Sequence, residues 1–384
     1  MRRIAAALMG LALAAGASSG AAAAPLTVVS DTPALPPSIS HLAVHSDRLN
    51  RDFELWVSVP SATVFLPGQK LPAIYALDSG YGIAGPQGTL LAATGAMAPA
   101  IIVSVGYKPT GVLFRNLDLT HNKFTAAPTM PPIGGGGAAF EAFLLEDLKP
   151  LIEAKYPADP NRAVLFGHSL GGLFAANVFA DNPDAFAAYI IGSPSVWADP
   201  GVVARVAAAA PKAHGRRVYL TVGSDESAGA IGGDNRMVDG FQSLAAVLKN
   251  QPGVILKTQL YAGETHLSYY PRLVTDGFPY VLPPARKLVA RQVKLPDATL
   301  ARYVGVYRMP DGRKITVTSD PRGQLMGQVT GLAPNPLQQN GPDRFYAPVA
   351  DINVQFDATG VTLTGVDGGK LRADREAAAP TPAS

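Results

Sequence analysis

Residues 167–171 spell the pattern G-x-S-x-G around Ser169. The short apolar segment 163–166 runs straight into this pattern, and a stretch of helical composition follows it. A strand, sharp turn and helix in this order form a nucleophile elbow, where glycine removes side chains that would collide. We therefore predict that Ser169 is a nucleophile and that the backbone N–H of Leu170 helps to hold an oxyanion.

A serine hydroxyl needs a base before it can attack, and histidine is the usual one. Of the six histidines, only His214 and His266 follow Ser169. In the fold that carries this elbow, the order along the chain is nucleophile, acid, histidine. His214 precedes the strand that would supply the acid, whereas His266 follows the predicted strand 254–261. We predict that His266 is the general base and that His168, inside the elbow, is structural.

The orienting acid is expected just after the predicted strand 218–222, where two adjacent carboxylates occur. Asp225 or Glu226 could hold the imidazole through its Nδ1 hydrogen bond, and the spacing alone leaves both open. Adjacent side chains point in different directions, so we expect only one of them to act.

The other half of the oxyanion hole is expected in the loop after the apolar segment 73–77. A backbone N–H of Ser79 or Gly80 is the candidate donor. Asp78 could brace this loop or form an ordinary Asx turn. Tyr81, the next residue, is a candidate substrate contact.

The pattern of apolar residues predicts the scaffold that positions these loops. Short apolar runs alternate with helical segments, as expected for strands buried on both faces of a parallel sheet. The runs are 73–77, 100–105, 164–166, 189–191, 218–222 and 254–261, and the helical segments are 139–155, 170–180 and 238–249. Two earlier segments, 41–46 and 52–59, are predicted to pair as antiparallel strands. The fold class is α/β, an α/β-hydrolase with a doubly wound, mostly parallel sheet.

The stretch 121–137 is rich in proline and glycine and is predicted to be irregular. A long irregular loop in a compact domain is often part of a binding site, and a surface excursion is the alternative.

The composition changes after about residue 291. Short alternating segments separated by turns such as Pro310-Asp311-Gly312 predict a small all-β C-terminal domain. The expected organisation is a signal peptide at 1–24, a catalytic domain at 25–291, the β domain at 296–375 and a disordered tail at 376–384.

The N-terminus predicts export. Arg2 and Arg3, the apolar run 4–15 and an A-x-A site near Ala23 form the layout of a cleaved signal peptide. We expect a periplasmic or secreted protein without a stable membrane anchor. The chain has no cysteine, which excludes disulfides and thiolate metal sites. A net charge of +3 without a basic cluster argues against nucleic acid as a partner.

Several segments together resemble one family of esterases, which includes the ferric enterobactin and salmochelin esterases. The resemblance spans roughly residues 40–271. Its segments are Tyr75-Ala76-Leu77-Asp78, Arg115-Asn116-Leu117-Asp118-Leu119-Thr120, Gly135-Gly136-Gly137-Ala138-Ala139-Phe140, Phe166 to Phe174 and Ser193-Pro194-Ser195-Val196-Trp197.

The resemblance implies ester hydrolysis, and the predicted serine mechanism requires no metal or organic cofactor. The family's Gly-x-x-Glu pattern matches 223–226 and favours Glu226 as the acid. Arg115 matches an arginine near anionic ligand, although pairing with Asp118 is the structural alternative, and Trp197 is a further candidate substrate contact. The family usually has Asp-Gly after the early strand, so Asp78-Ser79-Gly80 departs from its pattern. The β domain is also outside the usual layout, and it is similar to a small β-barrel in some penicillin-binding-protein-like hydrolases.

The substrate is predicted to be a small-molecule ester. A siderophore trilactone and a general acyl ester are both open, and the same residues would permit acyl transfer. A non-catalytic ligand-binding protein on a hydrolase scaffold is the alternative from another class.

Overall fold

The computed structural model describes residues 39–60, 69–77, 82–107, 112–125, 129–227, 236–284, 296–332, 334–365 and 368–376. The predicted signal peptide and the tail beyond residue 376 lie outside these ranges, as do Ser79, Gly80 and Tyr81. Within the described part, no helix is both long and apolar enough to cross a membrane.

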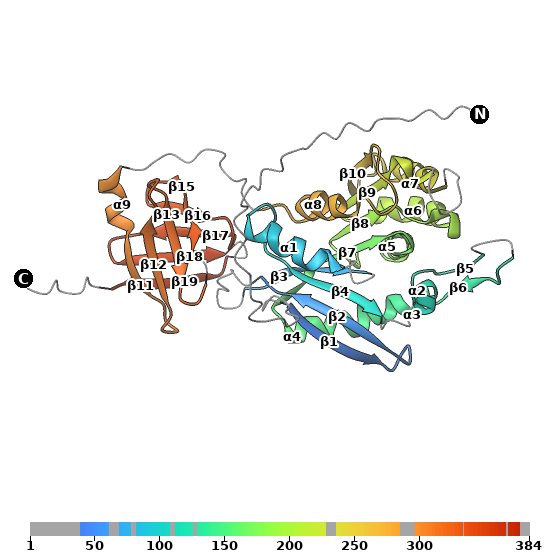
Figure 1. The fold of residues 1–384 in the computed structure, drawn as a ribbon, viewed down its shortest axis with the longest axis horizontal. Coiled ribbons are helices and arrows are strands. Elements are labelled where there is room, and N and C mark those ends of the chain that lie inside the picture. The colour runs from blue at the N-terminus through green and yellow to red at the C-terminus, as the bar shows by residue number, and fades with distance from the viewer. Residues whose placement is uncertain are drawn as a thin grey trace, which may run out of the picture. The chain divides into compact units, whose positions relative to one another are not determined.

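An eight-stranded sheet organises the first part of the chain (Figure 1). Its spatial order is β1-β2-β4-β3-β7-β8-β9-β10, with β1 and β2 antiparallel and every pair from β4 to β10 parallel. The strands are β1 (Ile39–Ser46), β2 (Arg51–Ser58), β3 (Leu71–Ala76), β4 (Ile101–Tyr107), β7 (Ala158–His168), β8 (Ala188–Gly192), β9 (Arg216–Gly223) and β10 (Val254–Tyr261). The predicted strands and their mostly parallel arrangement are therefore present.

Burial along the strands follows their place in this order. The central strands β3 and β8 are buried at every residue, as the continuous apolar runs predict. The prediction that 254–261 is buried on both faces is wrong, because β10 lies at the edge of the sheet and only its last residue, Tyr261, is buried. An edge strand has a neighbour on one side only, so its apolar residues are less completely covered.

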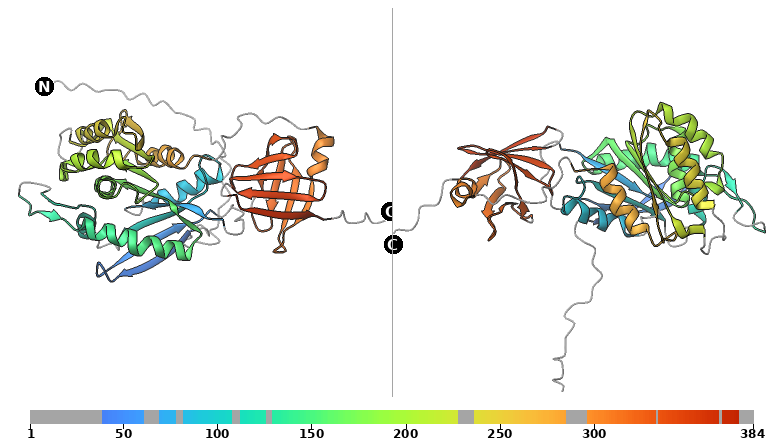
Figure 2. Two further views of the ribbon diagram at one scale, coloured as in Figure 1. Left: turned by 180° about the vertical axis from the view of Figure 1, so that it is seen from behind. Right: turned by 90° about the horizontal axis from the view of Figure 1, so that it is seen from above.

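Helices cover both faces of the sheet, as Figures 1 and 2 show. One hydrophobic cluster joins the sheet to α3, α4, α5, α6 and α7, and a second joins its other face to α1 and α8. The helices are α1 (Ala84–Ala93), α2 (Val112–Asp118), α3 (Gly137–Ala142), α4 (Lys149–Lys155), α5 (Leu170–Asp181), α6 (Val202–Ala209), α7 (Arg236–Leu248) and α8 (Tyr270–Val281). The predicted single helix 139–155 is instead α3 and α4 joined by a π-helical segment, Phe143–Leu148.

The predicted irregular stretch 121–137 contains regular structure. Strands β5 (Lys123–Phe124) and β6 (Ile133–Gly134) pair antiparallel into a short hairpin. Gly134 and Gly135 have φ angles of 94° and 92°, which glycine adopts without strain. The expectation of wholly irregular backbone was wrong, because Gly134 pairs with Lys123, and a Cβ atom at Gly134 would lie only 2.1 Å from Thr120 Oγ1.

The C-terminal part forms a separate antiparallel sheet of nine strands, β11 to β19. Its order, β14-β13-β12-β11-β19-β18-β17-β16-β15, places β14 (Asn335–Pro336) and β15 (Gln338–Gly341) at opposite ends. Only Leu337 separates these two strands in sequence, so the sheet curls into a nearly closed barrel. One helix, α9 (Asp297–Tyr303), precedes it and was not predicted. The other strands are β11 (Gly305–Arg308), β12 (Lys314–Ser319), β13 (Leu325–Val329), β16 (Arg344–Ala347), β17 (Ile352–Phe356), β18 (Gly360–Gly365) and β19 (Lys370–Arg375).

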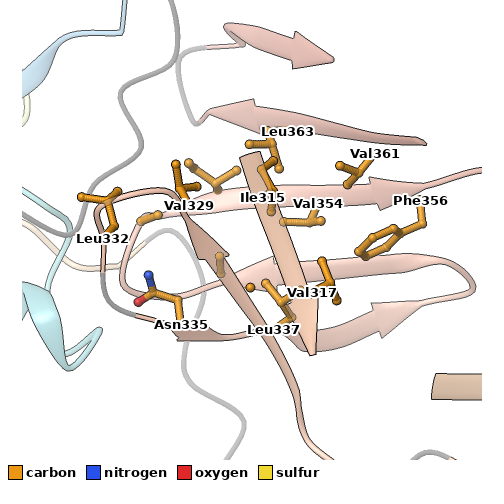
Figure 3. A pocket seen from close by; sticks show the side chains of 14 residues that line it. Ile315, Val317, Val329, Leu332, Asn335, Leu337, Val354, Phe356, Val361 and Leu363 are labelled. Atoms are coloured by element: carbon orange, nitrogen blue, oxygen red, sulfur yellow. The ribbon is translucent and has the colours of Figure 1, made fainter. Parts of the chain in front are cut away.

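The barrel has its own apolar core. A cavity of about 50 Å³ lies within it, lined by side chains such as Ile315, Val354 and Phe356 (Figure 3). The small volume shows that side chains fill most of the interior, as is usual for small barrels.

Close packing of α5 depends on Gly172. A Cβ atom there would lie 2.5 Å from the carbonyl oxygen of Gly192 at the end of β8. We expect Gly172→Ala to lower the free energy of unfolding by about 1–3 kcal/mol, because the backbones would have to separate. Gly201→Ala is the matched control, since its nearest neighbour is the flexible guanidinium of Arg205 at 3.0 Å. Equal urea midpoints for the two variants would contradict the requirement for glycine at position 172.

Candidate active site

Ser169 occupies the sharp turn between β7 and α5. Its φ and ψ angles are 61° and −121°, a conformation that side chains rarely adopt. A Cβ atom at Gly167 would lie 2.0 Å from the carbonyl oxygen of Gly171, so the turn requires glycine at that position. Leu170 is the first residue of α5, where backbone N–H groups have no acceptor within the helix. The turn has the geometry of a nucleophile elbow.

His266 and Glu226 form a hydrogen-bonded pair beyond the ends of β9 and β10. His266 Nδ1 lies 2.8 Å from Glu226 Oε2, and the carboxylate is fully buried. A carboxylate can only accept, so Nδ1 carries the proton and Nε2 is left unprotonated in the neutral ring. The second oxygen, Oε1, accepts the backbone N–H of Gly223 at 2.8 Å.

Asp225 points differently from its neighbour. Its side chain is exposed and accepts a hydrogen bond from Ser224 Oγ at 2.8 Å. Its backbone N–H donates to the carbonyl oxygen of Glu264 at 2.9 Å, which ties the turn after β9 to the turn that carries His266. The hydrogen-bond partner of the imidazole is thus Glu226, while Asp225 helps to hold the two turns together.

His168 lies beneath the pair. Its ring centroid is 4.5 Å from that of His266 and 5.3 Å from that of Tyr270. Burial, followed by the charges of His266 and Arg115, holds the pKa of His168 well below its usual range. His168 is therefore neutral and packs against the imidazole of His266.

A pocket of about 560 Å³ brings most of the predicted site residues together. Of the sequence candidates, its lining includes Ser169, Leu170, His266, Glu226, Asp225, Arg115 and Trp197. Ser79, Gly80 and Tyr81 lie outside the described residues. Asp118 forms an ion pair with Arg51.

One wall of the pocket comes from the β5–β6 hairpin, through Phe124 and Ile133. Phe124 packs edge-on against Trp197, with ring centroids 5.5 Å apart. The guanidinium of Arg236 lies 5.4 Å from the ring centroid of Trp197. Of the two interpretations of segment 121–137, a contribution to the pocket is the one that agrees with this geometry.

The hairpin is fastened at its base by polar contacts. Asn122 donates to Asp199 at 3.1 Å, and His121 Nε2 lies 3.2 Å from Glu141 and 3.3 Å from Asp181. The last three residues are the one group in the described ranges that could supply three metal ligands. None of them lines the pocket, and their contacts join the hairpin to α3 and α5.

The sequence analysis missed several pocket residues, of which Ser195 is the nearest to the nucleophile. Its hydroxyl oxygen lies 3.4 Å from Ser169 Oγ, and its backbone N–H donates to the carbonyl oxygen of Ser169 at 3.1 Å. Its place just after β8 could have indicated it, because ligands bind at the carboxyl ends of parallel strands. The other missed residues are Asn116, Phe124, Ile133, Met237, Thr265 and Leu267.

Comparisons with known proteins agree with this arrangement. The family model described as "Putative esterase" matches residues 46–247. The ferri-bacillibactin esterase BesA of Bacillus subtilis (strain 168) is 34% identical over 260 residues, covering 61% of this chain and 86% of the relative. This chain belongs to that esterase family.

Further relatives and solved structures extend the comparison. The apo-salmochelin esterase of Escherichia coli O6:H1 is 28% identical over 161 residues, covering 38% of this chain and 48% of the relative. The BES protein from Bacillus cereus matches with a TM-score of 0.59 at 29% identity, covering 66% of this chain and 99% of that one. An IroE-like serine hydrolase from Shewanella oneidensis shares the fold, with a TM-score of 0.58 at 19% identity over 66% of this chain and 83% of that one. The predicted family and fold class are confirmed, and the family membership supports ester hydrolysis.

Matched amide variants distinguish the roles of the two adjacent carboxylates, Asp225 and Glu226. Glu226→Gln should lower kcat for an ester substrate on the order of 10⁴-fold, because a neutral amide cannot hold the imidazolium in the same way. Asp225→Asn should change kcat less than about threefold, as its exposed side chain does not contact the imidazole. Steady-state kinetics on both variants measures this. A larger loss in Asp225→Asn would reverse the assignment.

Because His168 is buried and neutral, we expect the free energy of unfolding to depend on pH. Below its ordinary pKa of about 6.5, the unfolded chain binds a proton that the folded protein does not. The contribution of His168 therefore falls by up to about 1.4 kcal/mol per pH unit as the pH decreases. In His168→Gln this contribution is absent, so the wild-type advantage in unfolding free energy should shrink from about pH 7.5 to 5.5. An advantage that stays constant in urea titrations at both pH values would contradict it.

Proposed function

We propose that this protein is a serine carboxylic-ester hydrolase in which Ser169, His266 and Glu226 form the catalytic triad. The observation that carries the proposal is that the elbow serine and the buried histidine–carboxylate pair meet on one pocket. The chain order Ser169, Glu226, His266 is also the order of this fold. Family membership supports the reaction type.

The proposed reaction has two halves, acylation and deacylation, and the same groups act in both. His266 Nε2 takes the proton of Ser169 as its Oγ attacks the ester carbonyl, and the Leu170 N–H stabilises the oxyanion. His266 then protonates the departing alcohol, leaving an acyl group on Ser169. Water attacks this acyl-enzyme with His266 again as base, and His266 then returns the proton to Ser169 Oγ as the carboxylic acid leaves.

We propose a siderophore ester as the substrate. The names of two relatives, ferri-bacillibactin esterase and apo-salmochelin esterase, support this class. The pocket agrees with it, since Phe124 and Trp197 offer aromatic surface and Arg115 offers a guanidinium for anionic oxygens. A general acyl ester is the alternative, and the two differ in how strongly hydrolysis should depend on Arg115.

We also propose that the protein acts in the periplasm or outside the cell, with the catalytic domain at 25–291 and the β domain at 296–375. The charged, apolar and small-residue layout of residues 1–24 supports export. Separate hydrophobic clusters in the two parts support the domain boundaries.

Hydrolysis of a siderophore trilactone and of p-nitrophenyl esters by wild type and Ser169→Ala tests the reaction. We expect kcat to fall roughly 10⁴–10⁶-fold in the variant, because the nucleophile is lost. A variant that keeps more than a few per cent of the activity would remove Ser169 from the mechanism. Adding a competing alcohol and analysing the products separates hydrolysis from acyl transfer.

The Arg115→Gln variant tests the substrate class. We expect KM for the trilactone to rise about 10–100-fold, the effect of losing one charge-assisted contact, with little change for p-nitrophenyl acetate. Arg322→Gln in the β domain is the matched control. Equal effects of Arg115→Gln on both substrates would favour a general esterase.

A further inference from the structure

Three buried hydroxyl groups form a series of hydrogen bonds that ends at Glu226, and none of the three lines the pocket. Ser193 follows β8, Thr221 lies on β9, and Tyr269 immediately precedes α8. All three side chains belong to residues with no exposed surface. Thr221 contacts Tyr269, Tyr269 contacts Ser193, and Ser193 contacts Glu226 Oε1. This oxygen is the one that His266 does not contact.

The direction of these hydrogen bonds follows from the chemistry of their ends. A carboxylate only accepts, so the Ser193 hydroxyl must donate to Glu226 Oε1. Ser193 has a single hydroxyl proton, and its oxygen must therefore accept from Tyr269. The oxygen of Tyr269 accepts in turn from Thr221 Oγ1 at 3.5 Å. Each hydroxyl in the series therefore donates toward the carboxylate, from Thr221 through Tyr269 and Ser193 to Glu226.

The backbone and the surrounding residues hold this series of hydrogen bonds in place. Ser193 has a φ angle of 39°, in the left-handed region that non-glycine residues rarely adopt. Its backbone N–H donates to the carbonyl oxygen of Thr221 at 2.8 Å, which fixes it to β9. Burial and then the charge of Glu226 raise the pKa of Tyr269, so the phenol keeps the proton that it donates.

We propose that Ser193 and Tyr269 are positioning residues that act through Glu226, and that the aligned hydroxyls stabilise the carboxylate that orients His266. Hydrogen bonds in such a series polarise one another, and a buried carboxylate needs donors in place of the lost water. The proposal rests on the proposed triad. It adds residues that do not touch the substrate and that no feature of the G-x-S-x-G pattern indicates.

A double-mutant cycle tests the proposal on the full-length protein with a p-nitrophenyl ester. Tyr269→Phe removes one hydroxyl and keeps the ring that stacks on Tyr261 at 5.2 Å. We expect kcat to fall about 10-fold or more with KM within about twofold, because the hydroxyl serves a charged group outside the pocket. In the Glu226→Gln background, the same substitution should change kcat less than about twofold.

Control variants separate positioning from a general loss of packing. Tyr219→Phe removes a buried hydroxyl that bonds to Tyr261 at 2.8 Å and not to Thr221, Tyr269 or Ser193. This variant should leave kcat nearly unchanged. If Tyr269→Phe does not fold, Ser193→Ala replaces it in the double-mutant cycle with Glu226→Gln.

The outcomes distinguish this proposal from the triad on which it rests. A loss that persists undiminished in the Glu226→Gln background, or no loss at all in an enzyme that requires Ser169 and Glu226, would overturn the positioning role alone. Retention of activity in Ser169→Ala or Glu226→Gln would overturn the triad, and the positioning role with it.

Discussion

The buried carboxylate of Glu226 sets the strongest constraint on the active-site half of this molecule. A charge removed from water is stable only where donors replace the lost hydration. Glu226 has the backbone N–H of Gly223, the Ser193 hydroxyl and His266 Nδ1, and these come from three separate chain segments. Strands β8, β9 and β10 must therefore end side by side. The parallel order of the sheet provides this, because the carboxyl ends of parallel strands meet at one edge.

The elbow at Ser169 depends on the same edge. Its backbone N–H donates to the carbonyl oxygen of Gly192 at 2.9 Å, and Ser195 donates back to the carbonyl oxygen of Ser169. The end of β8 and the segment after it thus contact the proposed nucleophile through Gly192 and Ser195, and the proposed triad acid through Ser193. One short segment, 192–195, connects both halves of the proposed machinery.

Local patterns made the turn at Ser169 and most of the strands predictable from the sequence, and chain order made His266 the candidate base. The elbow is a five-residue motif, and strand burial appears directly as apolar runs. The choice between Asp225 and Glu226 could not be made from spacing, because it depends on which side chain turns inward. The hydroxyls of Ser193 and Tyr269 were out of reach for the same reason, since their contacts join segments far apart in the chain.

The errors in the predicted elements also have physical causes. Apolar residues alone could not show that β10 lies at an edge, because strand order is a property of the whole sheet. The proline and glycine content of 121–137 concealed a two-residue pairing in which Gly134, lacking a side chain, lies close to Thr120. This hairpin then supplies Phe124 and Ile133 to the pocket, so the least regular part of the predicted domain contributes to the site.

A crystal structure of the protein after reaction with diisopropyl fluorophosphate would test the central claim most directly. The account predicts a phosphorus atom bonded to Ser169 Oγ, its free oxygen within about 3 Å of the Leu170 N–H, and His266 still hydrogen-bonded to Glu226. An unmodified Ser169, or an adduct formed on another residue, would contradict it.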